Sequence, residues 1–123
     1  MNSVQSKAWR ELKYEEVKSA VERGDESAKT KLAWLKLSGL GGAEVDEDGA
    51  VALLEERVKA GDDGDAMWML GVCYEYGRGI EQDIERANML YRRSREKGNK
   101  IGAFFVSQAE NEIESGMLKM KRL

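Results

Sequence analysis

The chain has 123 residues, of which 41% are hydrophobic and 35% charged, and its formal net charge at pH 7 is -3. This composition predicts one soluble globular domain, because a chain of this length buries about two-thirds of its unfolded surface. The negative charge argues against nucleic-acid binding and an electrostatic membrane anchor. No segment has the roughly 18 apolar residues of a membrane span, and the charged N-terminus is not a signal peptide.

Residue types that are absent or rare exclude several kinds of site. No Pro is present, which favours a chain made almost entirely of helices. No His is present, which excludes Ser-His and Cys-His catalytic pairs and His-containing zinc sites. The single cysteine, Cys73, excludes an intramolecular disulfide and is typical of a reducing compartment. We therefore expect a cytoplasmic protein that is not an enzyme, with no cofactor and no metal site.

Apolar residues at helical spacing predict the first three helices. A lone helix is expected over about 6–23. A first pair of helices follows over about 26–38 and 47–60, and Asp25 is expected to cap the first helix of that pair.

A second pair and a last helix follow the same pattern. Asp65 is expected as the N-cap of the first helix of this second pair, which Gly77 ends. Asp83 is expected to cap the next helix, and Gly98 to stop it. The last helix is expected over about 102–115.

The same residues recur along the chain about every 37 positions, which is the signature of a helical repeat. They are small where helices approach closely and large where side chains fill the space between pairs. The repeat-defining residues are Ala28, Leu32, Gly39, Gly41, Ala50, Leu53, Gly61, Ala66, Leu70, Gly71, Tyr74, Gly77, Gly79, Asp83, Ala87, Leu90, Tyr91 and Gly98. A single helical-repeat domain over 1–123 is thus expected, divided into a half repeat (6–24), two repeats (25–65 and 66–102), and a half repeat plus tail (103–123).

The second repeat resembles the Sel-one-like repeat family, a helical repeat related to the tetratricopeptide repeat. The residues that carry the resemblance are Ala66, Leu70-Gly71, Tyr74, Gly77-x-Gly79-Ile80, Asp83, Ala87, Leu90-Tyr91 and Gly98-Asn99. The first repeat matches less closely, because Ala33 replaces the motif's Gly and Lys36 its Tyr. The resemblance implies an all-α fold, a short right-handed α-solenoid of antiparallel helix pairs with about six helices.

The resemblance also implies a function without chemistry. We expect a non-catalytic adaptor or scaffold module that binds a protein or peptide partner, but no nucleic acid and no membrane, on the concave face of the repeats. In this family the first helix of each pair lines that face. The residues that the repeat spacing places there are Thr30, Trp34, Leu37, Trp68, Val72, Glu75 and Phe105, followed by Ala109 and Glu112.

Three aromatic residues carry this binding hypothesis. Trp34, Trp68 and Phe105 have no evident task in packing one repeat against the next, and aromatic residues are common among interface hot spots. The alternative is that they only close the superhelix against its neighbours. Full burial of both indoles would exclude the binding role.

Two stretches are similar to ligand-binding loops. Gly77-Arg78-Gly79 lacks the third glycine, the lysine and the preceding strand of phosphate loops, so a structural turn is expected. Glu44-x-Asp46-x-Asp48-Gly49, with Glu55 after a further five residues, nearly fits a calcium loop. The alternative function is therefore a calcium-responsive regulatory module through the acidic loop Glu44–Glu55. The glycines just before it argue against an entering helix, and in the other interpretation Asp46 and its neighbours cap the helix that follows.

The remaining features are expected to be structural or solvent-exposed. The Asp62-Asp63-Gly64-Asp65 stretch predicts a polar loop. The basic run over 92–100 predicts a solvated helix face, and the alternative is that it binds an acidic peptide or nucleic acid. Cys73 is expected in the core. The amphipathic tail Met117–Leu123 either covers the C-terminal end of the fold or docks on a partner or a second copy. The terminal half repeats offer a route to a homodimer.

Overall fold

The computed structural model describes the backbone of residues 8–121 and the side chains of residues 8–116. Every regular element within residues 8–121 is helical, as predicted. A single helical turn at residues 8–10 is followed by α2 (Tyr14–Glu22), α3 (Ala28–Ser38), α4 (Glu47–Ala60), α5 (Gly64–Tyr76), α6 (Ile84–Glu96) and α7 (Lys100–Lys121). None of these helices has the combined length and apolar character that crossing a membrane requires.

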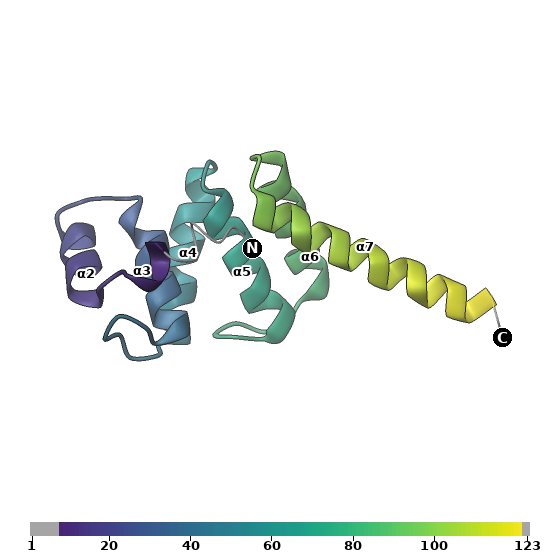
Figure 1. Cartoon of the computed structure of the whole chain (residues 1–123), viewed down its shortest axis with the longest axis horizontal. Helices are drawn as coiled ribbons and strands as arrows, with labels where there is room; N and C mark the ends of the chain where they lie inside the picture. The colour runs from purple at the N-terminus through teal and green to yellow at the C-terminus, as the bar shows by residue number, and fades with distance from the viewer. Residues whose placement is uncertain (1–7, 122–123) are drawn as a thin grey trace.

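The helices form an open α-solenoid. They follow one another in chain order along the long axis of the molecule, and α7 projects from the far end (Figure 1). The pairs α3–α4 and α5–α6 have extensive internal contacts, α4 packs against α5 to join the pairs, and α7 packs on α6 and touches α5. The predicted fold class is therefore confirmed.

The core explains why the repeat alternates small and large residues. Ala66 and Ala87 are fully buried, and each lets a neighbouring helix approach closely. Gly71 does the same for the ring of Tyr91, since a Cβ at Gly71 would lie 2.5 Å from that ring. Leu54 and Tyr91 are 0% and 1% exposed and fill the space between pairs. Burying such a side chain stabilises the fold by roughly 1.5–3 kcal/mol.

The lone N-terminal helix predicted over 6–23 is wrong as a single element. After the helical turn the chain leaves the helix, and α2 begins only at Tyr14. The backbone N–H of Tyr14 donates to the carbonyl oxygen of Gly41 at 2.9 Å. A side chain at Gly41 would collide with the carbonyl oxygen of Leu12. The segment thus gives up helical hydrogen bonds to pack against the loop that follows α3.

The predicted helix ends are correct at several positions. Asp83 caps α6, because its carboxylate accepts a hydrogen bond from the backbone N–H of Arg86 at 3.1 Å. Gly77 ends α5 in the left-handed conformation, and Gly98 follows the end of α6. At α3 the predicted N-cap is wrong, because the helix begins at Ala28 with Ser27 as its N-cap residue, although the carboxylate of Asp25 accepts a hydrogen bond from the backbone N–H of Ser27 at 3.1 Å.

The predicted N-cap of α5 is wrong. Asp63, and not Asp65, occupies the N-cap and accepts a hydrogen bond from the backbone N–H of Ala66 at 3.0 Å. Asp65 lies in the first turn, where its carboxylate accepts from Trp68 Nε1 at 3.0 Å and from Asn99 Nδ2 at 2.8 Å. Asp65 thus joins the first turn of α5 to the residue before α7.

Helix α7 is longer than the predicted 102–115. Its backbone continues through Lys121 and runs away from the body of the solenoid (Figure 1). The tail predicted over Met117–Leu123 therefore does not fold back over the end of its own chain as far as Lys121. Its side chains lie outside the described residues.

Candidate functional site

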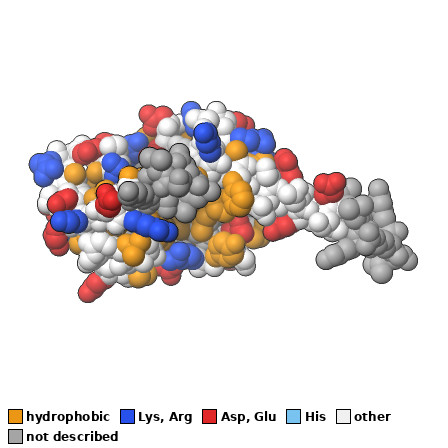
Figure 2. All heavy atoms as spheres, viewed as in Figure 1, with side chains coloured by type: hydrophobic (Ala, Val, Ile, Leu, Met, Phe, Trp, Pro, Cys, Tyr) orange, Lys and Arg blue, Asp and Glu red, His pale blue; other side chains and the backbone are white. Residues whose placement is uncertain are grey.

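The first helices of the pairs, together with α7, carry a continuous row of half-buried side chains. This row, called here the A-helix face, consists of Trp34, Leu37, Trp68, Val72, Glu75 and Phe105, all of intermediate exposure. The apolar members pack with one side against the main core cluster and leave the other side open. Figure 2 shows hydrophobic side chains gathered over α5 and the start of α7.

Ring packing fixes the C-terminal half of the A-helix face. The rings of Trp68 and Phe105 stack with centroids 5.9 Å apart, and Phe105 also stacks on Tyr91 at 4.6 Å. Trp68 is held further by the hydrogen bond from its indole N–H to Asp65. The expectation that these aromatic residues lack a packing task is therefore wrong, because Phe105 joins α7 to α5 and α6.

The N-terminal turn covers part of the other half of the face. Trp9 packs edge-to-face on Trp34, with ring centroids 5.5 Å apart and planes at 79°. Trp34 nevertheless keeps intermediate exposure, as does Trp68. The condition that would exclude a binding role, full burial of both indoles, is not met.

Thr30 does not belong with the other predicted face residues. Its side chain is only 3% exposed, and its hydroxyl donates to Oδ2 of Asp63 at 2.6 Å. The same carboxylate oxygen accepts from Nε of Arg57 at 3.1 Å. Thr30 thus ties α3 to the loop before α5 and offers no side chain to a partner.

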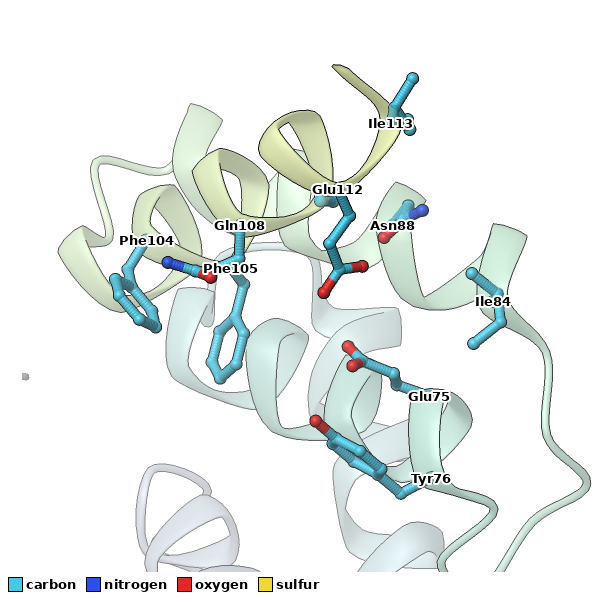
Figure 3. A pocket seen from close by; sticks show the side chains of 10 residues that line it. Glu75, Tyr76, Ile84, Asn88, Phe104, Phe105, Gln108, Glu112 and Ile113 are labelled. Atoms are coloured by element: carbon cyan, nitrogen blue, oxygen red, sulfur yellow. The ribbon is translucent and has the colours of Figure 1, made fainter. Parts of the chain in front are cut away.

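Glu75 brings negative charge to the end of the face. Its carboxylate accepts a hydrogen bond from the hydroxyl of Tyr91 at 2.7 Å. Burial, together with this hydrogen bond, raises the pKa of Tyr91, so the hydroxyl remains a donor at neutral pH. The carboxylates of Glu75 and Glu112 face each other across an open space (Figure 3).

That open space is a groove of about 460 Å³, which we call the C-terminal groove. It lies between the end of α5, the start of α6 and the middle of α7, and was not predicted. The residues that line it are Glu75, Tyr76, Ile84, Asn88, Phe104, Phe105, Gln108, Ala109, Glu112 and Ile113. Four of these, Tyr76, Ile84, Phe104 and Ile113, are large hydrophobic side chains between 49% and 65% exposed.

The glycine loop Gly77-Arg78-Gly79 forms the turn after α5, within the connection between the two helices of the second repeat, α5 and α6. Nη2 of Arg78 donates to the carbonyl oxygen of Leu37 at 2.8 Å, and its Nε pairs with the carboxylate of Glu47. Gly79 lies directly on the backbone of Glu47, where a Cβ would be 2.5 Å from the carbonyl oxygen. The loop therefore packs on the preceding repeat, and the guanidinium of Arg78 is engaged there.

The acidic stretch Glu44–Glu55 does not have the geometry of a calcium loop. Asp46 caps α4 by accepting from the backbone N–H of Gly49 at 2.9 Å. That bond, with Lys36 nearby, lowers the pKa of Asp46. Asp48 and Glu55 lie on one helix, about 10 Å apart along its axis, so they cannot surround one ion. Within residues 8–116, no three acidic or cysteine side chains come together as metal ligands would.

Comparison with known proteins agrees with this architecture. The Sel1 repeat family matches residues 27–62 and 64–99, which together make up more than half of the chain. No curated protein matches. Among solved structures, a Sel1 repeat protein from Oxalobacter formigenes has a TM-score of 0.67 and 28% identity over 76% of this chain.

A second solved structure is c5321, a protective antigen of uropathogenic Escherichia coli strains that displays an SLR fold. It has a TM-score of 0.63 and 25% identity, again over 76% of this chain. The chain spans only 37% and 20% of the lengths of these two proteins. The repeat spacing, the open solenoid and the family match agree, and the chain belongs to the Sel1 repeat family.

Proposed function

We propose that this chain is a non-catalytic scaffold, a single domain that binds a protein or peptide along the A-helix face. The observation that carries the proposal is the row of half-exposed apolar side chains on successive first helices. The stacked rings of Trp68 and Phe105 are already ordered, so little side-chain entropy remains to be lost on binding. Glu75 at the end of the row favours a partner with a basic residue at that point.

The environment of the only thiol supports the non-catalytic part of the proposal, and a single cysteine with no intramolecular disulfide partner is consistent with a reducing, cytoplasmic location. Cys73 is fully buried between core residues, and burial raises its pKa to about 11. At pH 8 only about one thiol in a thousand would then be ionised, and the thiolate is the reactive form. A reactive cysteine needs the opposite environment, exposed and close to positive charge.

We expect Cys73 to react with a thiol reagent such as DTNB at pH 8 only when the protein unfolds. The rate in buffer should be at least 100-fold below the rate in denaturant, because burial keeps the reagent away from the thiol and keeps the thiol protonated. Rapid reaction of the native protein would show that the α5 core opens easily and would remove this support.

The binding proposal is tested by adding charge to the A-helix face without breaking its ring packing. We expect Leu37→Lys/Val72→Lys to weaken capture of a partner from a source-cell lysate by at least tenfold, because a lysine charge must be desolvated at the interface. Both positions are half-exposed, and a lysine stem can cover the apolar surface beneath it. The measurement is quantitative mass spectrometry of captured proteins.

The matched control adds the same charges elsewhere. Val45→Lys/Met89→Lys alters two side chains that are 61% and 57% exposed and lie off the A-helix face. A partner retained by wild type and control but lost by the face variant supports the proposal, provided that both variants melt as cooperatively as wild type. Equal capture by all three proteins would contradict it.

A further inference from the structure

Helix α7 lacks the packing residues of the preceding first helix, α5. Aligned with α5 at a spacing of 37 residues, it replaces small and apolar packing positions by polar residues. The buried residues Leu70, Gly71, Cys73 and Tyr74 correspond to the exposed Ser107, Gln108, Glu110 and Asn111. A glutamine at the position of Gly71 leaves no room for a ring such as that of Tyr91. Another helix pair therefore cannot stack on α7 as α6 stacks on α5.

The C-terminal groove beside α7 nevertheless exposes large hydrophobic side chains. Phe104 and Ile113 of α7 are 53% and 61% exposed, and Ile84 at the start of α6 is 49% exposed. Glu75 and Glu112 point their carboxylates into the same space (Figure 3). Apolar walls with two carboxylates fit a segment that is both apolar and basic.

The C-terminal segment of the chain has this character. Residues 117–123 read MLKMKRL, with four apolar residues, three basic residues and no acidic one. We propose that residues 117–123 of a second copy of this chain occupy the C-terminal groove, with the α7 helices of the two copies antiparallel. A copy cannot fill its own groove in this way, because its α7 backbone runs away from the body through Lys121 (Figure 1).

The residues of α7 are complementary to themselves in the antiparallel direction. If Ile113 of each copy faces Gly116 of the other, Met120 reaches Ala109 and Lys119 comes beside Glu112. Nothing occupies the space within 4 Å of where a Cβ of Gly116 would stand, so the exposed Ile113 side chain can enter there. Since the interface is two-fold symmetric, each contact is made twice.

This proposal does not rest on the proposed scaffold function, although the A-helix face and the C-terminal groove share Glu75 and Phe105. Sedimentation velocity of the full chain from roughly 1 to 500 µM should show a mass that rises from 13.8 kDa towards twice that value. Glu112→Lys and Lys119→Glu should each weaken dimerisation by about tenfold or more, because each places like charges opposite each other twice. Glu112 is exposed, so its replacement does not disturb the fold.

Recombining the charges makes the test specific. An equimolar mixture of the Glu112→Lys and Lys119→Glu proteins should form a heterodimer, and the doubly substituted chain should again form a homodimer. Glu16→Lys on α2 makes the same charge change far from α7, and the mass measured by sedimentation should stay as in the wild-type protein. A wild-type protein that stays monomeric over the whole range would overturn the proposal, as would a dimer indifferent to both single substitutions.

Discussion

Replacing Asp63 by alanine is expected to lower the free energy of unfolding by about 3–4 kcal/mol. Its carboxylate caps α5 through the backbone N–H of Ala66 and accepts from the hydroxyl of Thr30 and from Nε of Arg57. Asp63 and Arg57 are only 14% and 13% exposed at their side chains. Truncation therefore removes a cap and leaves two partners without their acceptor. Urea denaturation followed by circular dichroism measures the loss.

The neighbouring aspartate is the matched control. Asp62 is 80% exposed, and its closest approach to Arg57 is 3.7 Å. Asp62→Ala should cost no more than about 0.5 kcal/mol, because exposed ion pairs contribute little. A double-mutant cycle of Asp63→Ala with Thr30→Val should show coupling of about 1 kcal/mol or more. Similar losses from Asp62→Ala and Asp63→Ala would show that net charge, rather than the buried network, stabilises this junction.

The Asp62-Asp63-Gly64-Asp65 stretch also shows where the sequence pattern stops being informative. Asp63 and Asp65 flank the same glycine, and both suit an N-cap by composition. What selects Asp63 is the position of Thr30 and Arg57, which belong to the preceding repeat. Local helix and capping propensities carry no information about such long-range contacts. The pattern therefore predicted a helix start within two residues but could not identify the residue that holds it.

The solenoid itself could be predicted because its packing is repeated. A requirement met at Ala66 and Gly71 for close helix approach recurs one repeat away, so spacing alone reveals it. The division of the N-terminal helix was not predictable in this way. It depends on the hydrogen bond from the backbone N–H of Tyr14 to the carbonyl oxygen of Gly41, whereas the equivalent glycine of the second repeat, Gly79, packs against Glu47 at the start of the unbroken helix α4.

The two candidate surfaces differ in how far the sequence predicts them, and the reason is the same. Trp68 and Phe105 occupy equivalent positions 37 residues apart, and Trp34 is equivalent to Val72, so their shared face follows from the repeat spacing. The covering of Trp34 by Trp9 depends on a segment outside the repeats, and no spacing predicts it. The C-terminal groove does not follow from the spacing, since Phe104 is 53% exposed although it corresponds to the fully buried Met67 of the preceding repeat.

Replacing Gly79 by alanine is expected to cost about 3–4 kcal/mol of unfolding free energy. The backbone of Gly79 has φ of +71°, which costs an alanine about 1–2 kcal/mol. The added Cβ would also lie 2.5 Å from the carbonyl oxygen of Glu47 and so force the loop away from α4. That shift would pull Arg78 from its partners, Glu47 and the carbonyl oxygen of Leu37.

Gly77 provides the control for this prediction within the same loop. Its φ is +66°, nearly that of Gly79, but an added Cβ would have no neighbour closer than 3.6 Å. Gly77→Ala should therefore cost only the conformational part, about 1–2 kcal/mol, when both variants are compared by urea denaturation. The difference between the two glycines measures how tightly the loop is held on the preceding repeat. Equal losses would mean that the loop can move away from Glu47 at little cost, and that Arg78 does not hold the two repeats together.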